Sequence, residues 1–188
     1  MLRYLRLALA LPFLLLALAC STQQPSGSTP TGDPEMDAKG RAALQQLFDS
    51  TPKAKDLQYQ AKAVLVFPDI VKAGLLVGAQ GGSGVLFASD GTVLGYYRAR
   101  ALSYGLQAGA QSFSEAMFFM TDAAVSDLSD GDGISVGVGP SVVVMDAGMA
   151  RSMTTTTLKS DVYAFVFGQQ GLMAGLGLQG QRIKKLDQ

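Results

Sequence analysis

The spacing of hydrophobic positions changes along the chain, from a helical period to an alternating one. From Pro34 onward, apolar residues recur every three or four positions, which predicts an amphipathic helix. Thr51 followed by Pro52 is typical of a helix start and predicts a second short helix that runs toward Ala61. The apolar positions of the first helix are Met36, Ala43, Leu44, Leu47 and Phe48.

After residue 62 the period becomes two. The apolar run 63–67 ends at Pro68 and predicts a buried strand. Because successive side chains of a strand point to opposite faces, a strand that alternates bulky residues with glycine has one bulky face and one nearly bare face. Four later segments have this pattern, in which glycine, serine or glutamine separates the apolar residues: 73–87, 103–112, 133–144 and 171–180.

The repeated glycines predict the shape of the sheet. Glycine weakens a strand, so it is expected where a sheet bends sharply or another backbone approaches closely. Its recurrence in four strands predicts a strongly curved, barrel-like and mainly antiparallel sheet. We expect the bare face to lie inside the tightest curve or under a closely packed helix.

The remaining segments complete an α+β fold class with N-terminal helices and a glycine-rich sheet. Phe113–Met120 has apolar residues on both faces, which predicts a central strand covered on both sides. Thr121 is a helix-capping residue and predicts a short helix near 121–129. Asp90 with Gly91 predicts a hairpin turn, and 162–167 is a further apolar strand.

The first 20 residues have the pattern of a secretory signal. Arg3 and Arg6 precede Leu7–Ala19, an uncharged run of 13 residues that is too short to cross a hydrocarbon core of about 30 Å. Ala17–Cys20 resembles the lipobox of bacterial lipoproteins, in which the cysteine is acylated. We therefore predict a signal peptide over 1–19 and lipidation of Cys20. The alternative is an ordinary secreted protein with a cysteine at its cleavage site.

The segment after the cysteine predicts a membrane tether. Ser21 is non-acidic, which resembles sorting to the outer membrane. Residues 21–34 contain no large apolar side chain and are rich in Ser, Thr, Pro and Gly, which predicts a disordered tether with a reach of about 20 Å. The predicted organisation is a lipidated cysteine and tether over 20–34, followed by a folded domain over 35–188 beside a bilayer, in the periplasm or at the cell surface.

Composition excludes several classes of function. Without Arg3 and Arg6 the chain has 13 basic and 15 acidic residues, a balance that does not suit nucleic-acid binding. It has no His and one Cys, so Ser-His-Asp catalysis, Cys-His catalysis and zinc sites lack their residues. We expect no cofactor and no metal. Nothing in the spacing of Asp69, Glu115, Asp122 and Asp146 favours an enzyme built on carboxylates.

Basic residues accompany the apolar segments. Lys39 and Arg41 lie on the first predicted helix, and such a helix can lie in a membrane interface. Anionic headgroups attract each nearby Lys or Arg by about 1 kcal/mol. The alternative is that Leu44, Leu47 and Phe48 pack on the domain, as in most amphipathic helices. Further basic residues lie beside the second helix and the strands: Lys53, Lys55, Lys62, Lys72, Arg98 and Arg100.

The ordered segments resemble a SYLF domain. The segment 61–86, AKAVLVFPDIVKAGLLVGAQGGSGVL, is similar to the opening of that domain, and 95–125, 133–148 and 155–180 are similar to its later parts, in the same order. The resemblance runs from about residue 40 to the C-terminus. Where family members commonly carry Trp, this chain has Ile134.

The resemblance implies a non-enzymatic lipid-binding module, tied in eukaryotic relatives to phosphoinositides and actin. For a bacterial lipoprotein it implies anionic membrane phospholipids as partners, contacted by basic residues and the N-terminal amphipathic helix. The alternative is an envelope protein-interaction or scaffold protein that uses the glycine-lined sheet face or the first helix. The predicted lipid-binding residues are Lys39, Arg41, Leu44, Leu47, Phe48, Lys62, Lys72 and Arg98.

Overall fold

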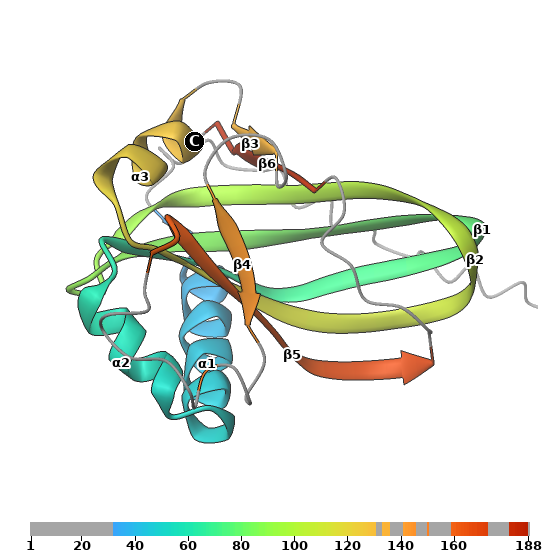
Figure 1. Cartoon of the computed structure of the whole chain (residues 1–188), viewed down its shortest axis with the longest axis horizontal. Coiled ribbons are helices and arrows are strands. Elements are labelled where there is room, and N and C mark those ends of the chain that lie inside the picture. The colour runs from blue at the N-terminus through green and yellow to red at the C-terminus, as the bar shows by residue number, and fades with distance from the viewer. Residues whose placement is uncertain are drawn as a thin grey trace, which may run out of the picture.

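Two very long strands, β1 (Ala63–Ala88) and β2 (Val93–Phe119), form the frame of the molecule (Figure 1). The structure, a computed structural model, describes residues 32–130, 133–135, 141–145, 150, 159–172 and 181–187. Three helices accompany the strands in this part of the chain: α1 (Pro34–Ser50), α2 (Lys53–Gln60) and α3 (Asp122–Ser129). Helices α1 and α2 lie together at one end of the sheet in Figure 1.

Strand β2 lies at the centre of the sheet. One of its edges pairs with β1, and its other edge pairs with β5 (Val162–Leu172) and then with β6 (Arg182–Lys185). The two shorter strands extend this edge, because β3 (Ile134–Ser135) pairs with β6 and β4 (Val142–Met145) pairs with β5. Only the β4–β5 pairing is parallel among the described strands. The sheet curls into a half-barrel, which confirms the predicted α+β class.

The prediction that the first strand ends at Pro68 is wrong, because β1 continues through it to Ala88. The pairing with β2 shifts between Phe67 and Ile70, so Pro68 lies in a bulge, where its missing N–H breaks no ladder hydrogen bond. The Ser114 hydroxyl donates to the Pro68 carbonyl oxygen at 2.7 Å. The segments 63–67 and 73–87 therefore belong to one strand.

The hairpin turn between β1 and β2 is confirmed. Ala88 N donates to Thr92 O at 2.8 Å, and the Asp90 carboxylate accepts from Thr92 N at 2.8 Å. Gly91 has φ +84°, a conformation that glycine adopts without steric cost. The predicted short helix is also confirmed, because the Thr121 hydroxyl accepts from Ala124 N at the start of α3.

Both long strands bend in their middle, at the right of Figure 1, and this bend has glycine on its inner side. Gly74 lies opposite Gly109, and a Cβ atom at Gly74 would overlap the backbone of Gly78. The intervening Leu75 and Val77 are exposed on the outside. The bare face therefore lies inside the tightest curve, as predicted from the sequence.

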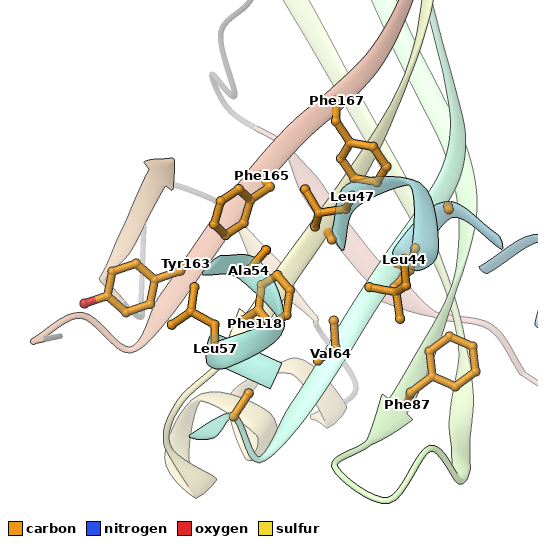
Figure 2. Packing of buried hydrophobic residues seen from close by; sticks show 14 of the residues in the cluster. Leu44, Leu47, Ala54, Leu57, Val64, Phe87, Phe118, Tyr163, Phe165 and Phe167 are labelled. Carbon is orange, nitrogen blue, oxygen red and sulfur yellow. The ribbon is translucent and has the colours of Figure 1, made fainter. Parts of the chain in front are cut away.

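Two hydrophobic clusters lie on opposite sides of the sheet. In the first, Leu44 and Leu47 of α1 and Leu57 of α2 pack on aromatic and aliphatic residues of the strands (Figure 2). In the second, Leu65 and Met117 inside the curl meet Leu128 of α3. Residues 116–119 of β2 alternate between the two clusters, which confirms the strand predicted to be covered on both sides.

The N-terminal predictions concern residues that the structure does not describe. The predicted signal peptide, Cys20 and most of the tether lie outside the described residues. So do 136–140 and 173–180 of the two later glycine-rich segments. Among the described helices, none has the length and apolar character needed to cross a bilayer.

Candidate functional site

Five basic side chains come together on β2 and β6. The strand pairing places Arg98 opposite Lys184 and Arg100 opposite Arg182. Like charges directly opposite each other destabilise a sheet, so this arrangement has a cost in stability. The cations surround an open hollow of about 400 Å³ that Leu186 also borders. We call this set the basic ridge: Arg98, Arg100, Arg182, Lys184 and Lys185.

The hollow beside the basic ridge has no acidic side chain among its described lining residues. In the part of the chain that the structure describes, no carboxylate lines this hollow, and none forms an ion pair with Arg98, Arg100, Lys184 or Lys185. Some cations elsewhere do form ion pairs; for example, Lys53 Nζ lies 3.2 Å from the Asp56 carboxylate. A concentration of like charge around a hollow raises the local concentration of counter-ions. The ridge can therefore attract an anion with several oxygen atoms.

A second hollow, of about 330 Å³, adjoins the ridge and shares Arg98 and Leu186 with it. Asp33 and Asp187 border this second hollow, so its charge is mixed. The Tyr96 hydroxyl accepts from Asp33 N at 2.5 Å and donates to the Asp37 carboxylate at 2.9 Å. These bonds attach the start of α1 to β2 and mark the side on which the purely basic surface ends.

The two predicted cations of α1 already have partners within the domain. Lys39 is exposed and donates to the Glu35 carboxylate at 2.6 Å, which raises the pKa of Lys39. Arg41 lies over the ring of Phe87, with its guanidinium carbon 4.7 Å from the ring centroid, and donates to Gly91 O at 2.9 Å. Arg41 thus holds the helix to the hairpin turn.

The apolar residues predicted to meet lipid lie in the first hydrophobic cluster. Leu44 and Leu47 are 6% and 1% exposed (Figure 2). Phe48 is partly buried against the same cluster. The structure therefore contains the alternative weighed from the sequence, in which these apolar residues of α1 pack on the domain. Contact of Leu44 or Leu47 with lipid would require α1 to separate from the sheet, and their lipid contact stays a prediction.

The other three predicted residues occupy different environments. Lys62 lies 3.5 Å from the Asp122 carboxylate at the start of α3. Lys72 is buried, opposite Gln111 on the inner face of the sheet. Only Arg98 belongs to the basic ridge.

Sequence reasoning missed the C-terminal half of the ridge. Arg98 and Arg100 are two positions apart, and so are Arg182 and Lys184, so each pair shares one face of its strand. That period-two spacing of cations was a signal in the sequence. The pairing of β2 with β6 was not, because more than 80 positions separate the two segments.

One buried acid of β2 is linked by a hydrogen bond to the start of β6. Glu115 is fully buried, and its Oε2 accepts from Gln181 Nε2 at 3.1 Å, one residue before β6 begins. Burial raises the pKa of Glu115 to about 7, and the hydrogen bond from Gln181 opposes the rise. Its Oε1 has no hydrogen-bond partner among the described residues. Glu115 is therefore enclosed in the core, whereas Asp69 and Asp122 are exposed.

No group of three acidic, cysteine or histidine side chains able to hold a metal ion occurs within the described ranges. Asp146, the remaining carboxylate weighed from the sequence, lies outside them.

Comparison with known proteins concerns the second half of the chain. No curated protein matches the sequence. Residues 100–188 match the family described as Las17-binding protein actin regulator, Ysc84. The matched part contains four of the five ridge residues, Arg100, Arg182, Lys184 and Lys185, and leaves α1, α2 and β1 outside. The match supports a SYLF domain in this chain, as the resemblance in the sequence predicted.

Proposed function

We propose that the chain is a non-enzymatic module that binds anionic phospholipids, and that the basic ridge is its contact with the headgroups. The observation that carries the proposal is the cross-strand cluster of cations around an open hollow, with no carboxylate among its described lining residues. The SYLF family is associated with lipid binding and with actin regulation. A positively charged surface of this kind supports the first of these associations.

The chemistry of the ridge suits phosphate groups. Arginine presents a planar fork of N–H donors that can bind two phosphate oxygens at once, and lysine adds a compact positive charge. At about 1 kcal/mol for each cation near an anionic surface, five cations contribute roughly 5 kcal/mol to membrane association. That is a weak affinity for a protein without an anchor.

The predicted lipid anchor would add a further attachment to the membrane. Stable residence at a membrane usually requires two signals, such as acyl chains and a basic patch. We propose acylation at Cys20 as the first signal, with the outer membrane as the location, and the basic ridge as the second. The tether over 20–34 would then hold the domain within reach of the headgroups.

The test is co-sedimentation of the protein with vesicles that contain phosphatidylcholine and increasing phosphatidylglycerol. A chain that begins at Ser21 is suitable, because both hydrophobic clusters and every described helix and strand come from residues after 32. This chain lacks the apolar run 7–19, which would bind vesicles by itself.

Three variants that each remove three positive charges separate the possible contacts. The ridge variant is Arg98→Gln/Arg100→Gln/Lys184→Gln, and the helix variant is Lys39→Gln/Arg41→Gln/Lys62→Gln. The control is Lys53→Gln/Lys55→Gln/Lys159→Gln, at three exposed lysines outside both sets. The net charge is the same in all three variants, so only the place of the charge differs.

We expect the ridge variant to lose vesicle affinity by on the order of 100-fold at low salt, with little change in the helix variant and the control. An equal loss in all three variants would indicate a response to net charge alone. A loss confined to the helix variant would move the contact to Lys39, Arg41 and Lys62, as the sequence predicted. Absence of binding by the unchanged chain would contradict the proposal and favour the protein-interaction alternative.

A further inference from the structure

An apolar surface lies beside the basic ridge, on the outside of the bend in the β1–β2 hairpin. Leu75 and Leu102 are 72% and 62% exposed, and Val71 and Val77 are 53% and 52% exposed. Monomeric soluble proteins rarely expose contiguous apolar patches larger than a few hundred Å², and patches of that size often mark sites of interaction with proteins or membranes. We call these four side chains the apolar bend: Val71, Leu75, Val77 and Leu102.

The apolar bend is a consequence of the way in which the sheet curves. Glycine on the inner side allows the two backbones to turn, as at Gly74 opposite Gly109. Because side chains alternate, the bulky residues between the glycines must then point outward. In an ordinary sheet a second layer would cover them, yet on this face they are in contact with solvent.

The apolar bend shares one face of the sheet with four residues of the basic ridge, whereas Lys185 lies opposite the inward-facing Tyr97. Arg98, Arg100 and Leu102 are at successive alternate positions of β2, so all three point to the same side. Across the strand pair, Leu102 lies opposite Ala79, which is two positions from Val77 on the same side of β1. The outer surface therefore changes from cationic to apolar within one strand.

From this arrangement we infer that the apolar bend enters the acyl boundary of the bilayer while the basic ridge binds the headgroups beside it. The occupant of the surface is a lipid bilayer with anionic headgroups. A soluble protein partner would meet the apolar residues equally well, but the adjoining row of cations favours a partner that is apolar in its interior and anionic at its boundary. Interfacial segments in proteins combine these two kinds of side chain in the same way.

The inference rests on the proposed function and adds to it the orientation in which the domain meets the bilayer. With the bend inserted, β6 and the part of β2 that pairs with it, residues 97–100, lie at headgroup level. Helix α2 lies at the far end of the sheet from the bend (Figure 1). Residues of α2 then stay in water, which provides an internal reference for the test.

The absence of tryptophan from the chain permits a direct measurement. Leu75→Trp places one fluorophore on the bend, and Tyr59→Trp places one on α2 at a residue that is 76% exposed. Each variant, in the chain that begins at Ser21, is mixed with phosphatidylglycerol vesicles with and without lipids brominated on their acyl chains. We expect the emission of Leu75→Trp to move to shorter wavelength and to be quenched by the brominated lipids, while Tyr59→Trp stays unchanged.

Each outcome decides for or against insertion. If the vesicles sediment the protein but Leu75→Trp remains as accessible to water as Tyr59→Trp, the proposed function stands and the insertion is wrong. If the protein does not bind vesicles, both are wrong. If Leu75→Trp emits at short wavelength before vesicles are added and the chain is dimeric, the bend is covered by a second copy and the inference is overturned.

A second pair of variants tests the same surface without an added probe. Leu75→Ser/Leu102→Ser removes two apolar side chains from the bend, and we expect about ten-fold weaker binding to vesicles. Leu94→Ser/Val144→Ser is the matched control, at residues that are 45% and 47% exposed outside the bend. Unfolding in urea should be alike for both double variants, because all four residues are exposed. Equal vesicle binding by the two double variants would contradict the insertion.

Discussion

The packed end of the β1–β2 hairpin and its bend use the same alternation of residues in opposite ways. At the packed end, bulky residues occupy both faces, and each face is covered by helices or by another part of the sheet. At the bend, glycine occupies the inner face and the bulky residues are left outside in solvent. The difference shows that apolar residues in a strand do not by themselves indicate a core. Whether a second layer is present decides their role.

The largest expected difference in stability comes from replacing one leucine at the packed end and one at the bend. Leu47→Ala removes a side chain that is 1% exposed, and we expect a loss of about 3 kcal/mol in the free energy of unfolding. Leu75→Ala changes a residue that is 72% exposed and should cost less than about 0.5 kcal/mol. Urea denaturation followed by circular dichroism measures both. Similar losses in the two variants would mean that the bend is packed in solution.

An effect of similar size concerns the buried acid on the inner face. The pKa of Glu115 is raised from an ordinary value of 4.5 to about 7, chiefly by burial. A raised pKa means that the folded state binds the proton more tightly than the unfolded state. This contribution to stability is complete below about pH 4.5 and is lost as the pH rises through about 7.

Glu115→Gln removes this titration. At about 1.36 kcal/mol for each pKa unit, we expect the variant to be more stable than the natural chain by up to roughly 3 kcal/mol at pH 8, and nearly equal to it at pH 4.5. Urea midpoints measured across this range provide the comparison. The control is Asp122→Asn, at an exposed position, which keeps Glu115 and should therefore keep the pH slope of the natural chain. A Glu115→Gln variant with the same pH slope as the natural chain would falsify the assignment.

Two glycines of β1 give an effect of intermediate size. A Cβ atom at Gly84 would lie 2.5 Å from Phe67 Cδ1 and 2.5 Å from the Val66 carbonyl oxygen, so Gly84→Ala should cost about 2 kcal/mol of stability. At Gly81 the nearest atom is Ala99 O at 3.5 Å, an ordinary contact. Gly81→Ala should therefore be neutral or stabilising by about 0.5 kcal/mol. Equal denaturation midpoints would show that the two halves of β1 are not in close contact.

The smallest expected effect concerns the attachment of α1 to the hairpin turn. Arg41→Ala removes the contact with the Phe87 ring and the hydrogen bond to Gly91 O, which together should contribute about 1 kcal/mol. Lys55→Ala, at an exposed position of α2, should leave the denaturation midpoint unchanged. Equal denaturation midpoints for Arg41→Ala and Lys55→Ala would mean that the contacts of Arg41 with Phe87 and Gly91 do not stabilise the fold.

Local sequence patterns predicted most of the elements and failed where a distant contact intervened. The helical spacing around Leu44, the Asp90-Gly91 turn and the Thr121 cap depend on neighbouring residues, and all three predictions are confirmed. Pro68 was predicted to end its strand, because proline cannot donate to a ladder hydrogen bond. The bulge that accommodates Pro68 depends on β2, a strand whose pairing no local pattern specifies.

The candidate site, too, was predicted from the sequence only in part. Of the eight residues predicted to bind lipid, only Arg98 lies in the ridge, while Leu44 and Leu47 lie in the core. The helix pattern shows that these leucines share a face but not what covers that face. The C-terminal cations became part of a site only through the pairing of β6 with β2.

The sequence by itself determined the alternation of bulky and bare faces, the curvature that glycine permits, and the absence of histidine chemistry, because these depend on residue type and spacing. The tertiary structure alone decided which apolar residues are buried and which cations face one another. Those properties depend on strand pairing over long distances in the chain. The curl of the sheet brings residues 98–100 and 182–185 together and leaves Val71, Leu75 and Val77 exposed to solvent.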